Sequence, residues 1–417
     1  MLALLFLKVP VFISVLGGAA VYFVASPKVN PIIFAQQTIT GVESIALLAI
    51  PFFVCAGIMM NYTGVTARIM NVCEVMTGRM YGGLAQVNVL LSTLMGGLSG
   101  SNLADAAMEA KMLVPEMEKK GFSKEFSSVV TATSAMITPL IPPGISMILY
   151  GCIANVSIGD LFISGIGVGL LLCVSMMIVV RIISKQRGYA PIRTTRVSFS
   201  EYVEAFKPAI LPLLLPIIII GGIRIGIFTA TEAGAVAIVY AVMLGFIYRE
   251  MRWEDMKKGF KETVCTTSSI MLIVAAAGVF SWVLTKERVP QQLTEWIVAT
   301  IDNKYVFLLI VNIFLLIVGM FIEGNASMII LVPLLHPIAM AYGINEIQFA
   351  MTYIFNNAIG ALSPPMGTLM FVTCSITKCK TAPFIKEAVP FYILLLINLM
   401  LLTWFEPFTT LLVDLFY

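Results

Sequence analysis

Long apolar segments, separated by short polar loops, fill most of this 417-residue chain. A helix needs roughly 20 apolar residues to cross a bilayer, so the pattern predicts an all-α polytopic membrane protein. The expected crossings are residues 2–24, 44–60, 161–183, 209–222, 230–248, 263–284 and 390–404. Residues 26–43 are expected to be a polar connection, and residues 198–206 a surface helix capped by Ser198 or Ser200. Residues 65–79 and 291–301 are amphipathic and are expected to lie along the membrane interface.

Four further apolar segments are interrupted by small and polar residues. Residues 84–117 are broken at 96–102, and residues 306–341 are broken at 323–325. Each arm is too short to cross alone, so each segment is predicted to be a re-entrant helical hairpin. Residues 126–150 and 347–376 are long enough to cross but are broken at the proline pairs within 139–144 and 362–368. Such interruptions are tolerated in a membrane only around a cavity or inside protein.

The interruptions recur at one constant spacing. Six matched positions lie 222 residues apart: Gly97 and Gly319, Pro115 and Pro337, Gly121 and Gly343, Pro142 and Pro364, Pro143 and Pro365, Ser146 and Thr368. Lysines surround Gly121, whereas no Lys or Arg occurs between Lys304 and Lys378. Cytoplasmic loops are rich in Lys and Arg, so the pattern predicts two repeats of inverted topology, with a binding site at their interface. The alternative is coincidence, because Pro and Gly are common in membrane helices.

Composition supports the membrane assignment and argues against nucleic-acid binding and against a His-based metal site or catalytic triad. The chain is 59% hydrophobic and 12% charged, with a net charge of +3. The basic residues sit in short loops, which indicates orientation in a lipid bilayer and no nucleic-acid partner. The seven cysteines form no C-x-x-C pair and are expected to be small buried residues, although Cys374 and Cys379 flank a basic turn that can be exposed. With His336 as the sole histidine, a His-based metal site or triad cannot form, and a structural role is favoured.

The interrupted segments suggest two cation sites, because a helix that ends inside the membrane offers carbonyl oxygens and the negative end of its dipole. The predicted first sodium site is Ser99, Ser101, Asn102, Asp105, Pro139, Pro142 and Gly144. The predicted second site is Gly324, Asn325, Ser363, Pro364, Gly367 and Thr368. Asp105 can be a cation ligand or a helix cap, and Glu323 is expected to take a comparable place in the second half.

Helix amino termini at the same tips would also suit an anionic substrate. The candidate substrate-binding residues are Ser101, Asn102, Asn325, Asn356 and Asn357. Their side chains can hydrogen-bond hydroxyls or carboxylates, and polar contacts that pack helices together are an equally good explanation.

The run from Gly97 to Asp105, followed by Pro115, by Thr138-Pro-Leu-Ile-Pro-Pro-Gly and by the Ser-Pro-Pro motif at Ser363, resembles the large membrane (M) subunit of tripartite ATP-independent periplasmic (TRAP) transporters. The resemblance covers nearly the whole chain, and residues 101–117 resemble the sialic acid members. It implies sodium-driven import of an organic acid, such as sialic acid or a C4-dicarboxylate, across a bacterial inner membrane. It also implies two partners: a periplasmic substrate-binding (P) protein and a small four-helix membrane (Q) subunit, expected here as a separate polypeptide.

The resemblance further implies the elevator-type fold of the ion transporter superfamily. The moving transport domain would then comprise residues 85–184 and 305–390. Residues 1–84, 185–304 (an arm helix and scaffold helices) and 391–417 would form the scaffold.

Two other functions stay open. A stand-alone dicarboxylate/sodium carrier of the same superfamily would need no binding protein. A channel would need no inverted hairpins, and an intramembrane enzyme would need a metal cluster, a Ser-His pair or a His-Glu motif that the sequence lacks. No Walker-type phosphate loop is present either, so the sequence gives no sign of ATP use or of enzymatic activity.

Overall fold

The computed structural model describes residue 4, residues 9–26 and residues 29–416, and these residues form helices and no strand. Among these described residues, six helices are long and apolar enough to cross a membrane, or up to eight if each bent pair is one crossing. The polytopic α-helical class predicted from the sequence is therefore confirmed. Of the crossing expected at residues 2–24, helix α2 covers Val11–Ala25, and residues 2, 3 and 5–8 lie outside the described residues.

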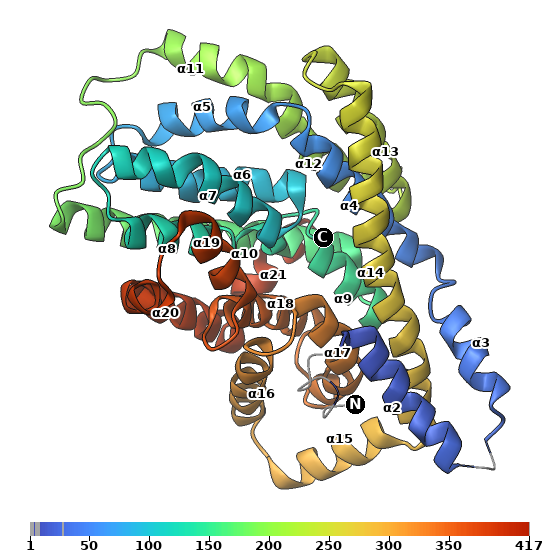
Figure 1. The fold of residues 1–417 in the computed structure, drawn as a ribbon. Helices are drawn as coiled ribbons and strands as arrows, with labels where there is room; N and C mark the ends of the chain where they lie inside the picture. Colours follow the sequence, from blue (N-terminus) through green and yellow to red (C-terminus); the bar gives the residue numbers. More distant parts are fainter. Residues whose placement is uncertain (1–3, 5–8, 27–28, 417) are drawn as a thin grey trace.

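One flank of the molecule consists of five helices: α2 (Val11–Ala25), α3 (Ile32–Thr40) and α4 (Ala49–Asn61) pack against the long helix α14 (Trp253–Lys286), and α13 (Ala230–Ile247) packs against α4 (Figure 1). Helix α3 was predicted as a polar connection, and that prediction is wrong. Phe34 of α3 packs edge-on against Phe23 of α2, and Gly41 beside α3 meets Gly278 of α14 with no room for side chains. Tertiary packing thus makes a helix of a sequence that looks like a linker.

The first set of interrupted segments lies beside this flank. It comprises α5 (Val65–Thr77), α6 (Gly83–Ser99), α7 (Asn102–Lys119), α8 (Lys124–Ser134), the 3₁₀ turn η2 (Thr138–Leu140), α9 (Ile145–Ala154) and α10 (Ile158–Gln186). The hairpin tip is narrower than predicted, because α6 continues through Gly96 and Gly97 and leaves only Gly100 and Ser101 outside the two helices. Gly100 has a φ of +63°, a conformation that favours glycine, and it reverses the chain there.

The middle of the chain contains α11 (Phe199–Phe206), η3 (Lys207–Ala209) and α12 (Ile210–Arg224), which follow one another without a gap. Ser198 is the residue before α11, but its side chain makes no capping hydrogen bond. Helix α14 begins ten residues earlier than the predicted crossing at 263 (263 − 253). Arg249 and Arg252 therefore precede the helix, whereas Lys257, Lys258 and Lys261, which lie between the predicted crossings 230–248 and 263–284, are part of it.

The second set of interrupted segments comprises α15 (Val289–Thr300), α16 (Lys304–Gly319), α17 (Gly324–Ala341), α18 (Glu346–Leu362), α19 (Thr368–Thr377) and α20 (Thr381–Trp404). The hairpin break spans residues 320–323, so Gly324 and Asn325 belong to the first turn of α17 and not to the break. The crossing predicted at residues 390–404 is the second part of α20, which begins at Thr381, and the separate helix α21 (Pro407–Phe416) follows it and was not predicted.

Helix starts in the two sets repeat the spacing found in the sequence. Helices α7 and α17 begin 222 residues apart (324 − 102), and so do α8 and α18 (346 − 124). Gly121 and Gly343, in the turns between these helices, both have positive φ. Both Pro-Pro bonds, at 142–143 and 364–365, are cis.

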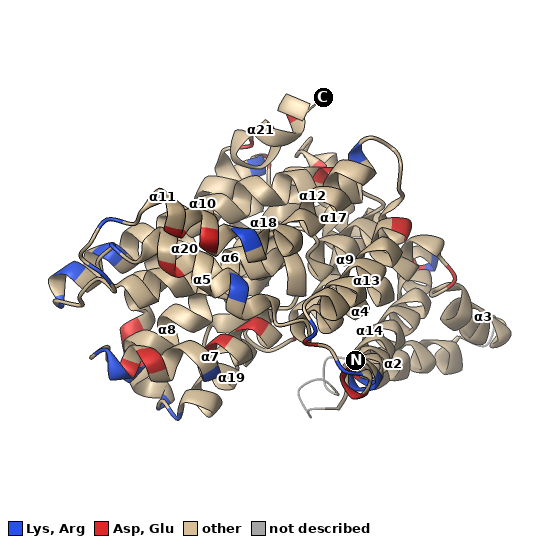
Figure 2. Ribbon diagram, turned by 90° about the horizontal axis from the view of Figure 1, so that it is seen from above, with Lys and Arg blue, Asp and Glu red and all other residues tan. Residues whose placement is uncertain are grey.

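Charged residues and cysteines complete the picture. Lys and Arg gather at one edge of the molecule, beside α8 and α11 (Figure 2). All seven cysteines lie within the described residues. Cys374 and Cys379 are buried, so the alternative that their turn exposes them does not hold, whereas Cys265 was expected to be buried and is exposed. His336 of α17 forms a 3.0 Å hydrogen bond through Nδ1 with the Tyr150 hydroxyl of α9, consistent with a structural role.

Candidate functional site

The first hairpin tip packs against the break in the α8–α9 segment, backbone against backbone. A Cβ added to Gly96 would lie 2.9 Å from the Cα of Thr138, and one on Gly97 would lie 3.1 Å from the carbonyl oxygen of Pro142. Gly100 meets the carbonyl oxygen of Pro143 in the same way, at 3.1 Å. The glycines thus bring the carbonyl oxygens of the proline break directly to the tip.

Asp105 connects this tip to the break. Its Oδ2 accepts hydrogen bonds from Ser99 Oγ at 2.6 Å and Thr138 Oγ1 at 2.7 Å, and the residue is 1% exposed. Asp105 is not the helix cap, because Ser101 holds that position and its hydroxyl accepts from the Ala104 amide. The cap interpretation is therefore wrong, and the carboxylate instead collects oxygen-bearing groups from two separate segments.

Glu109, one turn further along α7, escaped the sequence analysis. It is fully buried, and both of its carboxylate oxygens lie within 2.8 Å of Ser92 Oγ on α6. Within the described chain no ion pair includes Asp105 or Glu109. An acidic residue four positions from Asp105, and therefore on the same face of the helix, was the signal that could have revealed it.

The second tip has a different chemistry. Glu323 is the residue before α17, and its carboxylate accepts from the Ala326 amide at 3.1 Å. It lies 222 residues after Ser101, the corresponding cap, and not after Asp105. The expectation that Glu323 takes the place of Asp105 was therefore wrong. Asn357 of α18 fixes this tip, because its Nδ2 donates to the Gly324 carbonyl oxygen at 2.6 Å.

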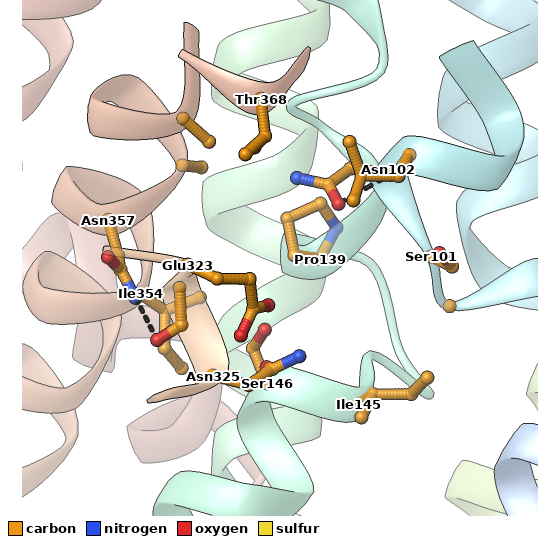
Figure 3. A pocket seen from close by; sticks show the side chains of 15 residues that line it. Ser101, Asn102, Pro139, Ile145, Ser146, Glu323, Asn325, Ile354, Asn357 and Thr368 are labelled. Atoms are coloured by element: carbon orange, nitrogen blue, oxygen red, sulfur yellow. Dashed lines mark hydrogen bonds between the residues drawn. The ribbon is translucent and has the colours of Figure 1, made fainter. Parts of the chain in front are cut away.

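Both tips open into one cavity of about 100 Å³, shown in Figure 3. The first half of the chain contributes Gly100, Ser101, Asn102, Leu103, Pro139, Ile145 and Ser146. The second half contributes Glu323, Gly324, Asn325, Ile354, Asn357, Ala358, Ala361 and Thr368. The Glu323 carboxylate points into this space beside Asn325 and Ser146 (Figure 3). Carboxylate, amide and hydroxyl groups from both halves thus converge on one small volume.

Several predicted site residues lie elsewhere. Asp105, Pro142, Gly144, Ser363, Pro364 and Gly367 do not line this cavity. Asn356 is fully buried, and its Nδ2 donates to the carbonyl oxygen and Oδ1 of Asn312 at 3.0 and 2.9 Å. It is therefore placed to pack α18 against α16, whereas its neighbour Asn357 faces the cavity.

A second cavity of about 820 Å³ adjoins the first, and Ser101, Leu103, Ile145, Glu323 and Asn325 line both. From the tips it extends along α4 and α14 to Asn61, Lys261 and Glu262. The Tyr62 hydroxyl donates to Glu262 at 2.9 Å, and burial, together with this carboxylate, raises the pKa of Tyr62 to about 12. This bond joins the end of α4 to the start of α14 beside the basic segment 249–261.

Comparison with known proteins adds a family and a fold. The family model for the DctM component of tripartite ATP-independent periplasmic transporters matches residues 1–408. The sialic acid TRAP transporter large permease protein SiaM of Vibrio cholerae is 38% identical over 416 residues, covering 100% of this chain and 97% of that protein. The C4-dicarboxylate TRAP transporter large permease protein DctM of Pseudomonas aeruginosa is 37% identical, covering 87% and 84%.

Among solved structures, the YdaH transporter of Alcanivorax borkumensis is similar with a TM-score of 0.59. It covers 90% of this chain and 87% of its own, at 13% sequence identity. At that identity the likeness concerns the fold alone, and that fold is the one of a membrane transporter.

Proposed function

This chain belongs to the DctM family of TRAP transporters, as a multi-pass large permease subunit of the inner membrane, and we propose that it imports a small organic anion by coupling its entry to sodium. The single observation that carries this proposal is the cavity shared by both hairpin tips. A site built from two halves of a chain, at helix ends inside the membrane, is the arrangement that secondary transporters use for substrate and coupling ions.

Sodium is proposed to bind at two places around this cavity. Sodium prefers several oxygen ligands, and the first tip offers them in the carboxylate of Asp105, the Ser99 and Thr138 hydroxyls and the carbonyls of the proline break. The second tip offers Glu323, Asn325 and Thr368. A cation at either tip would order it and complete the wall on which the anion sits, so substrate affinity would depend on sodium.

The substrate class follows from the relatives. SiaM is named for sialic acid and DctM for C4-dicarboxylates, so a carboxylate is the group that their substrates share. Ser101, Asn102, Asn325 and Asn357 line the shared cavity and are proposed to bind it, together with Ser146. Sialic acid is the first candidate, because its transporter is 38% identical over the full chain.

Movement is proposed to follow the elevator scheme. The matched helix starts support two repeats, each with one hairpin and one broken helix, and the distribution of lysines is the reason to propose that they are inverted. Residues 85–184 and 305–390 would move together against a scaffold of residues 1–84, 185–304 and 391–417. The larger cavity leads from the tips to the basic start of α14, which the positive-inside rule assigns to the cytoplasm, so this conformation is proposed to face inward.

Two protein partners complete the proposal: a small membrane subunit that supports the scaffold and a periplasmic binding protein that delivers the substrate. The test is uptake of radiolabelled sialic acid or succinate into proteoliposomes that contain this chain and its small subunit. Uptake that needs both an imposed sodium gradient and the binding protein is the expected result. Sodium-driven uptake without the binding protein would instead indicate a stand-alone carrier, and sodium-independent flux would refute the coupling.

A further inference from the structure

The wall of the larger cavity formed by α14 carries a stripe of polar side chains. Lys261, Cys265 and Ser269 follow one another at four-residue spacing, and all three line the cavity together with Thr266. Residues four apart lie on the same face of a helix, with Cβ atoms about 5–6 Å apart. The stripe therefore starts at the basic end of α14 and leads toward the hairpin tips, where Ser99 and Asn325 line the same cavity.

Lys261 begins this stripe, and its ammonium has no acidic partner. None of the ion pairs formed by the described residues includes Lys261, and the residue is exposed. Its neighbours are engaged: Lys258 lies 3.9 Å from Asp255, and Glu262 accepts the Tyr62 hydroxyl. The charge of Lys261 is thus free to act on an ion inside the cavity.

The charged groups of the cavity are separated along its length. Lys261 and Glu262 lie at the α14 end, and Glu323 lies at the hairpin tips. Glu262 keeps its negative charge, and its hydrogen bond with Tyr62 directs it toward the end of α4. Lys261 is the only basic residue among the described residues that line the cavity, so it is the one group there that can pair with a carboxylate, while the deep end presents a carboxylate suited to cations. An organic anion leaving the tips would therefore move away from a negative group and toward a positive one.

We propose that Lys261 is the anion-attracting group of the cavity mouth and receives the carboxylate of the substrate as it leaves the hairpin tips. Thr266 and Ser269 supply hydroxyls between the two ends, so a carboxylate or sugar hydroxyl can exchange hydrogen bonds along α14. This assignment rests on the proposed function, because it takes the larger cavity as the substrate path. It adds a specificity-determining residue outside the hairpins and broken helices.

Cys265, one turn from Lys261, allows a test that needs no transport. The complex in proteoliposomes is treated with small thiosulfonate reagents of opposite charge, and the modification rate of Cys265 is measured for each. A unit charge at about 6 Å in water changes each rate about threefold, so we expect Lys261→Gln to lower the anionic-to-cationic rate ratio by several-fold. The difference should shrink in high salt. Lys258→Gln is the matched control, since it removes the same charge from the same helix outside the cavity.

The second measurement is sodium-driven uptake and efflux of radiolabelled sialic acid or succinate. Lys261→Gln should slow both by several-fold, Lys261→Arg should restore them, and Lys258→Gln should match the parent protein. An unchanged rate ratio in Lys261→Gln would overturn the assignment. A lowered ratio with unchanged transport would also overturn it, because Lys261 would then serve only as a membrane-surface anchor. If the parent protein transports nothing, the proposed function fails, while the thiol assay still decides whether Lys261 attracts anions.

Discussion

Gly57 on α4 is the point at which the flank around α14 touches the first hairpin tip most closely. A Cβ at this position would lie 2.4 Å from the carbonyl oxygen of Ser99 and 3.1 Å from its carbonyl carbon. Ordinary contact begins near 3.4 Å, so Gly57→Ala requires a separation of about 1 Å between α4 and the tip. Both groups are backbone, and no rotamer change can relieve the overlap.

The size of the effect of Gly57→Ala on the conformational equilibrium follows from the free-energy cost of overpacking. Inserting a methyl group into a tight contact costs about 1–3 kcal/mol, whereas the gain in helix propensity from Gly to Ala is about 1 kcal/mol. The propensity gain applies in every conformation of the transporter, but the overlap exists only where Ser99 touches α4. The substitution should therefore disfavour the present conformation by about 5- to 150-fold relative to conformations in which the tip has moved away.

The assay is cytoplasmic labelling of Cys265 by a membrane-impermeant maleimide, followed by sodium-driven uptake. Cys265 lines the larger cavity and is exposed, so its labelling reports the fraction of molecules in the inward-facing conformation. Gly57→Ala should lower both labelling and uptake. The control is Gly221→Ala in α12, where no atom lies within 4 Å of the added methyl group. Equal labelling and uptake in the two variants would refute the idea that this contact is specific to one conformation.

Three further substitutions test the site and its packing. Asp105→Ala should raise the sodium concentration for half-maximal uptake about tenfold, equivalent to about 1.4 kcal/mol. Asp105→Asn keeps an acceptor for the Ser99 and Thr138 hydroxyls and should weaken sodium activation with little change in melting temperature; unchanged sodium activation in both variants would remove Asp105 from the ligands. Glu109→Ala should lower the free energy of unfolding by about 2–4 kcal/mol, because it leaves Ser92 unpaired beside a new void. Glu109→Gln should lower it far less. Equal denaturation midpoints for the two variants would contradict this prediction. Gly360→Ala should lower the melting temperature, because its Cβ would meet the Gly319 Cα at 2.6 Å; an unchanged value would show that α16 and α18 can separate freely.

The sequence predicted where helices break but not how the breaks are arranged. Glycine, proline and small polar residues mark positions where a membrane helix can be interrupted. The hairpin tip at Gly100 lies inside the break predicted at residues 96–102. Gly96 and Gly97 were wrongly included, because glycine inside a helix can serve close packing as well as interruption. Likewise, Asn356 and Asn357 are adjacent and chemically identical, and only their angular positions on α18 send one toward Asn312 and the other toward the cavity.

Other features depended on contacts between distant segments. Thr138 reaches Asp105 across 33 residues. The motif that begins at Thr138 indicates a break in the helix, but it does not indicate that the threonine side chain bonds Asp105. Lys261 lies outside the crossing predicted at residues 263–284, because the apolar pattern of α14 starts later than its hydrogen bonding does. A lysine near the start of a long helix faces a cavity only where the neighbouring helices pack so as to leave space beside it. Tertiary packing determines this, and the local sequence does not show it.

The two hairpin tips differ in a way that bears on the order of ion binding. The carboxylate of Asp105 lies behind the first tip, 1% exposed and bound to two hydroxyls, whereas the carboxylate of Glu323 faces the open cavity. A cation bound at Asp105 would have to pass the tip and displace its hydrogen bonds, and a cation at Glu323 would meet the solvent of the cavity directly. We therefore expect sodium to leave the second site before the first when the cavity faces inward. Loss of the cation beside Glu323 also exposes a bare carboxylate to the bound anion, so repulsion between the two would drive the substrate toward Lys261 and make release of the ion and of the substrate one coupled event.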